Sequence, residues 1–292
     1  MARRRHHVVS RGYQRFFADG ERVLLIDKNT RTYKEVGTRD TFVEAHFNSW
    51  RTQAGWDDSL EDQWQRIEGL VLPDVRVLLA GAGGEQQRGS AKILAAVHFA
   101  RSYSFRQMQA LVGNVVVETE GKRLAAAPLF VSLFTRDVGH APGPGEAEAY
   151  VADRWTDLTK NGRFLQERTV HAYHFAKDYF EPLHVQFLYS HPSLGFVTGD
   201  TPLIAADSHL FRTSIRDHMA LGDAERIWMP LTTTCSMSLW SSDQEAARDV
   251  RLPPSEVQKL NWLVWRAAAR FVICRPSQDP SRALLGTHLT RK

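Results

Sequence analysis

The strongest constraint on the fold is the order in which two hydrophobic periodicities follow one another along the chain. Short runs of strand-forming residues lie near both ends, and amphipathic stretches with helical spacing fill the middle. Strands therefore do not alternate regularly with helices, which argues against a doubly wound parallel sheet. The sequence predicts an α+β fold: a helix-rich body with a small, mostly antiparallel sheet built from an N-terminal hairpin and C-terminal strands.

The N-terminal hairpin is predicted from residues 22–27 (RVLLID) and 32–36, with a turn at Asn29 and Thr30. Residues 184–189 (HVQFLY) and 195–198 (GFVT) have the composition of a second hairpin. Three further strands are predicted at 226–229, 235–240 and 271–274. Helical spacing predicts helices at 59–71, 90–101, 104–115, 146–158, 164–180 and 255–268, and Pro73 is expected to end or kink the first of them.

The length and composition are those of an ordinary globular protein. The chain has 292 residues, of which 43% are hydrophobic and 24% charged, so it is long enough to bury a sizeable core. The most loop-like stretch surrounds Gly143-Pro144-Gly145, and helical spacing resumes directly after it. We therefore predict a single domain over residues 1–292 with a flexible loop near 139–146.

Charge and cysteine content indicate the compartment and the class of partner of this protein. The two cysteines, Cys235 and Cys274, form neither a disulfide framework nor a zinc-finger spacing, which indicates a reducing compartment and a cytoplasmic location. No run approaches about eighteen apolar residues, so no membrane span is expected. The formal net charge of +4 permits a nucleic acid or another anionic ligand as a partner without requiring one. The sequence gives no indication of the oligomeric state.

The opening residues 6–9 (HHVV), followed by Tyr13 and by 15–17 (RFF), resemble the start of a widespread bacterial family without an assigned activity, domain-of-unknown-function family 4238. In this sequence Ser10 stands where the family usually has proline, and Gly199 and Thr201 replace a serine and an asparagine of the family's Asp-x-Pro loop. Further stretches that match the family are 101–106 (RSYSFR), 198–202 (TGDTP), Pro230-Leu231 and Asn261. The resemblance implies candidate site residues but no reaction.

Histidines and carboxylates within these motifs are the candidates for catalysis and metal binding. Imidazole titrates near neutral pH and binds zinc or manganese, so His6 and His7 are candidates for a general base, and His7 for a metal ligand. Asp200 follows a predicted strand on a loop, a place that suits a catalytic carboxylate, a metal ligand or an Asx-turn. Glu44 is a further candidate ligand, because it shares a face with His46 if 42–46 is a strand. The expected metal is Mn²⁺, Mg²⁺ or Zn²⁺.

Two arginines and one asparagine are the candidates for substrate binding. Arg101 and Arg106 flank a break between two predicted helices, where they either clamp a phosphate or carboxylate or tie the helix ends together. Asn261, in the last helix, joins them through the family resemblance. These residues suit an anionic substrate, but a structural role for each is equally compatible with the pattern.

Two functions remain open at the level of sequence. In the first, the protein is a metal-dependent hydrolase of a phosphodiester or nucleic acid, similar to a nuclease, in which His6 or His7 acts with Asp200 and Glu44. In the second, it is a non-enzymatic binding or regulatory protein, and the His-His and Asp-x-Pro elements lock the fold. The histidines and Asp200 are expected to line an open cleft in the first case and to be buried and satisfied in the second.

Overall fold

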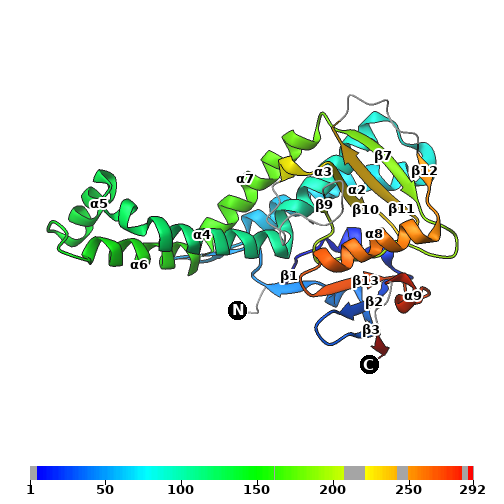
Figure 1. Cartoon of the computed structure of the whole chain (residues 1–292), viewed down its shortest axis with the longest axis horizontal. Helices are drawn as coiled ribbons and strands as arrows, with labels where there is room; N and C mark the ends of the chain where they lie inside the picture. Colours follow the sequence, from blue (N-terminus) through cyan, green and yellow to red (C-terminus); the bar gives the residue numbers. More distant parts are fainter. Residues whose placement is uncertain (1–4, 161, 207–220, 242–248, 285–288, 292) are drawn as a thin grey trace.

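The computed structural model describes residues 5–160, 162–206, 221–241, 249–284 and 289–291 (Figure 1). Within these residues, the body contains two five-stranded sheets and two short two-stranded ribbons, packed with long helices. The predicted α+β class is confirmed. None of the described helices is long and apolar enough to cross a membrane. That the whole chain is one domain stays a prediction.

The first sheet joins the two ends of the chain, as the sequence predicts. The hairpin is antiparallel, with Leu24 opposite Glu35, and its first strand also pairs with the last long strand, so that Ile26 lies opposite Val272. The order of strands in this sheet is β14 (Thr290–Arg291), β3 (Thr32–Gly37), β2 (Arg22–Asp27), β13 (Phe271–Cys274) and β8 (Thr198–Gly199). Val23 and Ile26 of β2 are buried on opposite faces of this sheet, which explains why the apolar residues of 22–27 follow one another without alternation.

The second sheet corrects one of the predicted strand pairings. Residues 184–189 form a strand, but it pairs with β11 (Cys235–Trp240) and β12 (Val250–Arg251) and not with 195–198. Instead, Thr198 and Gly199 pair with β13 in the first sheet, because the chain crosses from one sheet to the other after a tight turn that brings His191 opposite Leu194. The order of strands in the second sheet is β12 (Val250–Arg251), β7 (His184–Tyr189), β11 (Cys235–Trp240), β10 (Arg226–Pro230) and β9 (Ile204–Ala206).

Helices cover one side of the second sheet and fill the space between the two sheets. Helices α2 (Ser59–Val77), α3 (Glu85–Arg101) and α7 (Arg163–Phe180) share a hydrophobic core with strands of the second sheet. Helix α8 (Pro254–Ala267) contacts β8 of the first sheet and β9 of the second, and its Val257 and Val264 belong to a second core. Pro73 does not end α2, which continues to Val77.

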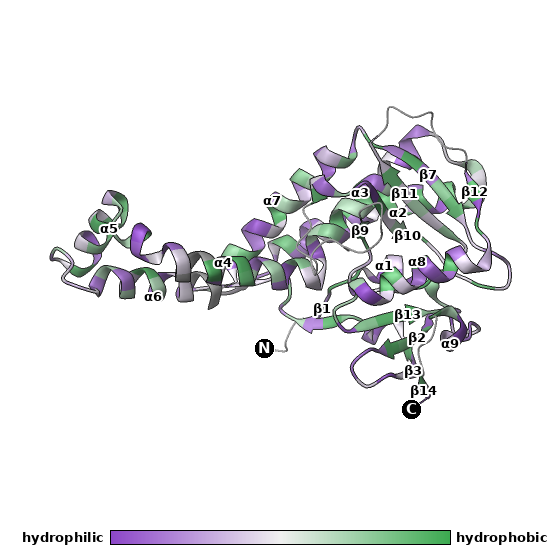
Figure 2. Ribbon diagram, in the orientation of Figure 1, coloured by the Kyte–Doolittle hydropathy of each residue, from purple (hydrophilic) through white to green (hydrophobic). Residues whose placement is uncertain are grey.

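A helical arm projects from the body (Figure 1). It consists of the far part of α4 (Tyr103–Ala125), α5 (Pro128–Val138) and α6 (Glu146–Lys160). A Cβ atom at Gly113 would lie 2.0 Å from the Trp155 ring, so the close crossing of α4 and α6 requires glycine there. In Figure 2 hydrophilic and hydrophobic residues alternate along the arm helices, as expected for helices with one solvent-exposed face. The predicted loop lies between α5 and α6, and its flexibility stays a prediction.

The remaining elements are short. Two ribbons hold the N-terminal region: β1 (Arg5–His7) pairs with β4 (Val43–Ala45), and β5 (Trp50–Thr52) pairs with β6 (Gly55–Asp57). The short helices are α1 (Arg11–Gln14) and α9 (Pro280–Ala283). The side chain of Ser10 accepts the Tyr13 N–H and so caps α1.

Candidate functional site

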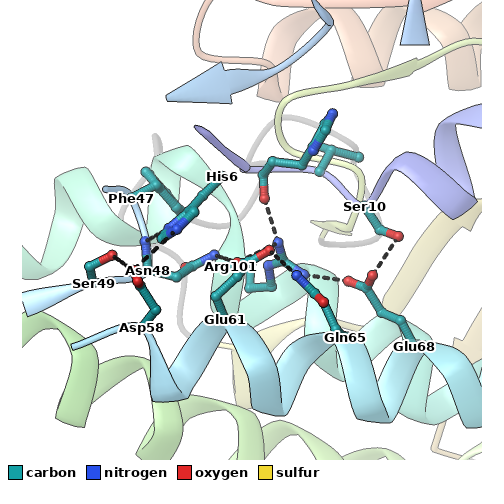
Figure 3. A network of polar contacts seen from close by, with 12 residues as sticks. His6, Ser10, Phe47, Asn48, Ser49, Asp58, Glu61, Gln65, Glu68 and Arg101 are labelled. Atoms are coloured by element: carbon teal, nitrogen blue, oxygen red, sulfur yellow. Dashed lines mark hydrogen bonds and ion pairs between the residues drawn. The ribbon is translucent and has the colours of Figure 1, made fainter. Parts of the chain in front are cut away.

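The His-His element forms strand β1, and its first histidine is buried against α2 (Figure 3). His6 is 3% exposed. Its Nδ1 accepts the backbone N–H of Asn48 at 3.0 Å, and its Nε2 lies 3.4 Å from Asp58 Oδ1. Because Nδ1 is an acceptor, the proton of the neutral ring is on Nε2 and faces the carboxylate. Burial lowers the pKa of His6, so the neutral form is favoured. Both ring nitrogens therefore face groups of the protein scaffold.

Arg101, at the end of α3, is the centre of the same buried network (Figure 3). Its guanidinium donates to Glu68 and to the backbone carbonyl of His7, and Nη2 lies 3.7 Å from Glu61 Oε2. Glu68 also accepts the hydroxyl of Ser10 at 2.8 Å. Burial raises the pKa of Glu68, although Arg101 and Ser10 oppose the shift. Arg101 thus fastens β1 to α2 and α3 and is 2% exposed, too enclosed for a substrate clamp.

His7 lies at the edge of this network and is partly exposed. Its Nε2 lies 3.3 Å from the carbonyl oxygen of Thr38, which indicates an N–H donated to the short 3₁₀ turn that follows β3. Burial lowers the pKa of His7, and the contact with Thr38 opposes that shift. The two adjacent histidines point in different directions, as alternation along a strand requires.

Asp200 follows β8 and holds the bend between α8 and β13. Its two carboxylate oxygens accept the backbone N–H groups of Ala269, Arg270 and Phe271 at 2.7, 2.7 and 2.8 Å. Burial raises the pKa of this carboxyl, and the three N–H donors oppose the shift by stabilising the charged form. The neighbouring Thr201 shares a hydrogen bond with Ser104 at 2.7 Å. The Asp-x-Pro loop therefore connects β13 of the first sheet to the start of α4.

The predicted metal ligands have separate partners. Asp200 holds the bend at residues 269–271, His7 faces Thr38, and Glu44 lies exposed on β4. Strand β4 ends at Ala45, and the ring of His46 stacks on Trp56 with 3.9 Å between centroids, so His46 does not form the expected pair with Glu44. In the part of the chain that the structure describes, no group of three or more histidine, cysteine, aspartate or glutamate side chains is arranged to hold a metal ion.

Arg106 and Glu44 line one hollow of about 520 Å³ between β4 and the first turns of α4. Arg106 donates to the carbonyl of Phe47 and lies over the Phe47 ring, with 4.4 Å to the centroid. Burial lowers the pKa of Arg106, and the charge of Glu44 opposes the shift. The two arginines that were expected to act together are therefore separated: Arg101 is enclosed, and Arg106 faces a hollow that also carries a carboxylate.

Asn261 is buried in α8 and supports a loop. Its Oδ1 accepts the N–H of Val197 at 3.0 Å, and its Nδ2 donates to the carbonyls of Gly195 and Ala283 at 3.0 and 3.2 Å. All of its amide groups that bond in this way face backbone, and the side chain is 0% exposed. Asn261 therefore supports the loop that begins after β7.

Sequence reasoning missed two buried residues next to this network. The hydroxyl of Tyr13 shares a hydrogen bond with Thr198 at 2.8 Å and donates to the Pro230 carbonyl at 2.5 Å, which links the opening motif to both later motifs. His98 lies 4.5 Å from the Tyr13 ring, and both of its ring nitrogens lack a partner among the described residues. Burial lowers the pKa of His98 to about 3. Tyr13 was named only as part of the family resemblance, whereas nothing in the apolar helix pattern singled out His98.

Comparison with known proteins matches part of the chain to a family model and gives no activity. No curated protein and no solved structure matches this chain. The matching family is described as "Protein of unknown function (DUF4238)". This description assigns neither a reaction nor a ligand. Its model matches residues 5–129, so the family resemblance that was predicted from the opening motif is confirmed for that segment of the chain.

Proposed function

We propose that the protein is a non-enzymatic binding or regulatory protein, in which the His-His and Asp-x-Pro elements lock the fold. The observation that carries this proposal is the bonding of Asp200, whose carboxylate accepts three backbone N–H groups within 2.8 Å. Such a carboxylate stabilises the bend that it caps, and its lone pairs are directed at the chain itself. Asp200 is 5% exposed, in keeping with this role.

The bonding of His6 supports the same proposal. A general base must present a free lone pair to the proton that it removes. The Nδ1 lone pair of His6 accepts the Asn48 N–H, and its protonated Nε2 faces Asp58. His6, His7 and Asp200 do not line the hollow of Glu44 and Arg106. They also do not line the hollow beside Trp50 and His171 or the one beside Tyr189 and Gln278. Burial of His6 and Asp200 is what the lock requires, whereas His7 is partly exposed.

The lock also gives a physical reason for the spacing of the motifs. Three stretches that are distant in sequence meet at the junction of α3 and α4: Arg101 binds the His7 carbonyl, and the Tyr103 N–H donates to the Asp200 carbonyl at 3.4 Å. Tyr13 adds a bond from the opening segment to Thr198. Arginine at a helix end and aspartate beside backbone donors suit this purpose without any reaction.

The response of stability to metal ions tests the proposal. We expect the melting temperature of the protein to be the same, within error, in EDTA and in millimolar Mn²⁺, Mg²⁺ or Zn²⁺. A ligand at a hundred times its dissociation constant adds about 2.7 kcal/mol, which corresponds to several degrees for a chain of this size. A metal-dependent rise that is absent in a folded His7→Ala variant would overturn the proposal in favour of the metal-dependent hydrolase.

A further inference from the structure

We propose that a hollow at the edge of the second sheet binds the phosphate group of a small phosphorylated molecule. The hollow has a volume of about 540 Å³ and lies between the loop that follows β7, the turn between β10 and β11, and the segment after β13. A volume of this size accommodates a small organic ligand. The inference deepens the proposed function, on which it rests, by naming a site and a ligand class for a binding protein.

The charge of the hollow comes from two arginines. Arg251 projects from β12 and Arg275 from the segment after β13, and no carboxylate is among the residues that line the hollow. Arg251 Nη1 donates to the Ser190 carbonyl at 3.1 Å, and Arg275 Nε lies 3.1 Å from Asp19 Oδ1. Within the described residues, the other nitrogens of both guanidinium groups have no partner. Asp19 offsets part of the charge of Arg275. The Nη groups of Arg275 and Nη2 of Arg251 remain as donors for an anion.

Hydroxyl groups add donors of the type that phosphate oxygens accept. Ser193, Thr233, Thr234 and Ser277 all line the hollow. The Ser193 hydroxyl already contacts His191 Nδ1 at 2.8 Å and the Thr234 hydroxyl contacts that of Thr232 at 3.1 Å, so Thr233 and Ser277 supply the hydroxyls that have no side-chain partner among the described residues. Guanidinium and hydroxyl donors together on one concave surface are typical of phosphate recognition, because a phosphate presents three acceptor oxygens and carries about two negative charges at neutral pH. Tyr189 and His191 line the same hollow and offer ring surfaces to the organic part of the ligand.

The walls of the hollow are fixed to one another before any ligand arrives. The Ser190 N–H donates to the Thr234 carbonyl at 2.9 Å, and the Phe196 N–H donates to the Thr233 carbonyl at 2.8 Å. The third wall is joined by Gln278, whose Nε2 donates to the Gly195 carbonyl at 2.8 Å. Asn261 bonds that same carbonyl from behind. This preorganisation lowers the entropic cost of binding, and it gives Asn261 a positioning role.

Two comparisons restrict the ligand to a small phosphate ester. The hollow beside α4 also contains an arginine, but Glu44 lines it together with Arg106 and opposes an anion there. Nucleic-acid binding usually depends on many phosphate contacts along an extended basic surface, and its affinity depends strongly on salt. Two arginines in one bounded hollow favour a single phosphate group.

The direct test is calorimetric titration of the full-length chain with inorganic phosphate and with 4-nitrophenyl phosphate, against sodium chloride at equal ionic strength. We expect saturable binding of both probes. The dissociation constant should rise at least about tenfold in Arg251→Gln, since the lost hydrogen bonds to a charged group correspond to that factor or more. Arg251 is exposed on an edge strand, so this variant is expected to fold. The double variant with Arg275→Gln should bind neither probe.

The matched control is Arg123→Gln, which removes an exposed arginine of α4 far along the chain from the hollow. It should bind both probes like the wild type. Binding that is equal in the double variant, no binding by the folded wild type, or preferential binding of a 20-nucleotide single strand would overturn the assignment of the hollow. Release of nitrophenol by the wild type would instead overturn the non-enzymatic function while leaving the hollow as the binding site, so the two failures are distinguishable.

Discussion

Arginine side chains in two regions of this protein have opposite environments. In the network below β1, Arg101 is enclosed, and its donors go to Glu68, to Glu61 and to a backbone carbonyl. In the hollow at the edge of the second sheet, Arg251 and Arg275 each make one polar contact with the described residues, and their other guanidinium donors have no partner there. The residue type is the same, and the environment decides its role.

This difference separates arginines that hold the fold from arginines that are available to a ligand. A buried charge is retained because its partners are fixed, and removing one partner leaves the other uncompensated. An exposed arginine held by one bond costs the fold little when it is replaced, and its remaining donors are available to a ligand. Motif residues near the start of the chain belong to the first kind, whereas the two arginines of the hollow lie outside every motif recognised in the sequence.

The largest expected effect is the loss of stability on replacing Arg101. Arg101→Met should lower the free energy of unfolding by about 3–5 kcal/mol, because Glu68 and Glu61 would be left buried without their cation. Urea unfolding followed by circular dichroism measures this change. Arg123→Met, at an exposed arginine, should change it by less than about 0.5 kcal/mol. A difference of less than about 1 kcal/mol between the two variants would contradict the distinction between the regions.

A second effect appears on acidification, because His98 is buried without partners among the described residues. Its pKa is about 3 in the folded protein, below its ordinary value near 6.5, so the unfolded chain takes up the proton first. His98 therefore leaves stability intact above pH 6.5 and lowers it as the pH falls toward 3, by up to about 1.4 kcal/mol per unit. The raised pKa values of Glu68 and Asp200 act in the opposite sense.

His98→Phe isolates the contribution of this histidine. The variant should lose stability less steeply than the wild type between pH 6.5 and 4.5, and the gap between the two should widen by about 2–3 kcal/mol over that range. Urea unfolding at a series of pH values measures the gap. His174→Phe, on the exposed side of α7, is the matched control and should leave the slope unchanged. Parallel pH profiles for the wild type and His98→Phe would show that residue 98 is not a buried neutral histidine.

The sequence predicted the elements of this fold better than their pairing. The hairpin at 22–36 was predicted from its strand-forming residues and its turn, and its pairing with 271–274 from the expectation that the two ends of the chain share one sheet; both are present. The partner of 184–189 could not be predicted, because the segment 195–199 suits a hairpin locally and is drawn to the other sheet by its bonds to β13 and α8. Pro73 lies within α2 for a similar reason, since burial of Leu72 and Val75 stabilises the continued helix.

In the candidate site, too, the sequence indicated which residues matter but not which residues they contact. The sequence singled out His6, Arg101 and Asp200 by residue type. In the structure Arg101 and Asp200 each make several bonds, and His6 makes one hydrogen bond and one close contact with a carboxylate. Their partners include Asn48 and the backbone at 269–271, which no spacing rule connects to them. Arg251 and Arg275 were missed because they carry no motif and are brought to one hollow only by the crossing between the two sheets.

If the carboxylate of Asp200 holds the fold, Asp200→Asn should destabilise the protein. An amide replaces one carboxylate oxygen with a donor, so at least one N–H of residues 269–271 loses its acceptor. We expect urea unfolding to show a loss of about 1–3 kcal/mol in the free energy of unfolding of Asp200→Asn, and no comparable loss in Asp153→Asn, at an exposed aspartate of α6. An Asp200→Asn variant as stable as the wild type would show that Asp200 does not hold the fold and would make it a catalytic candidate again.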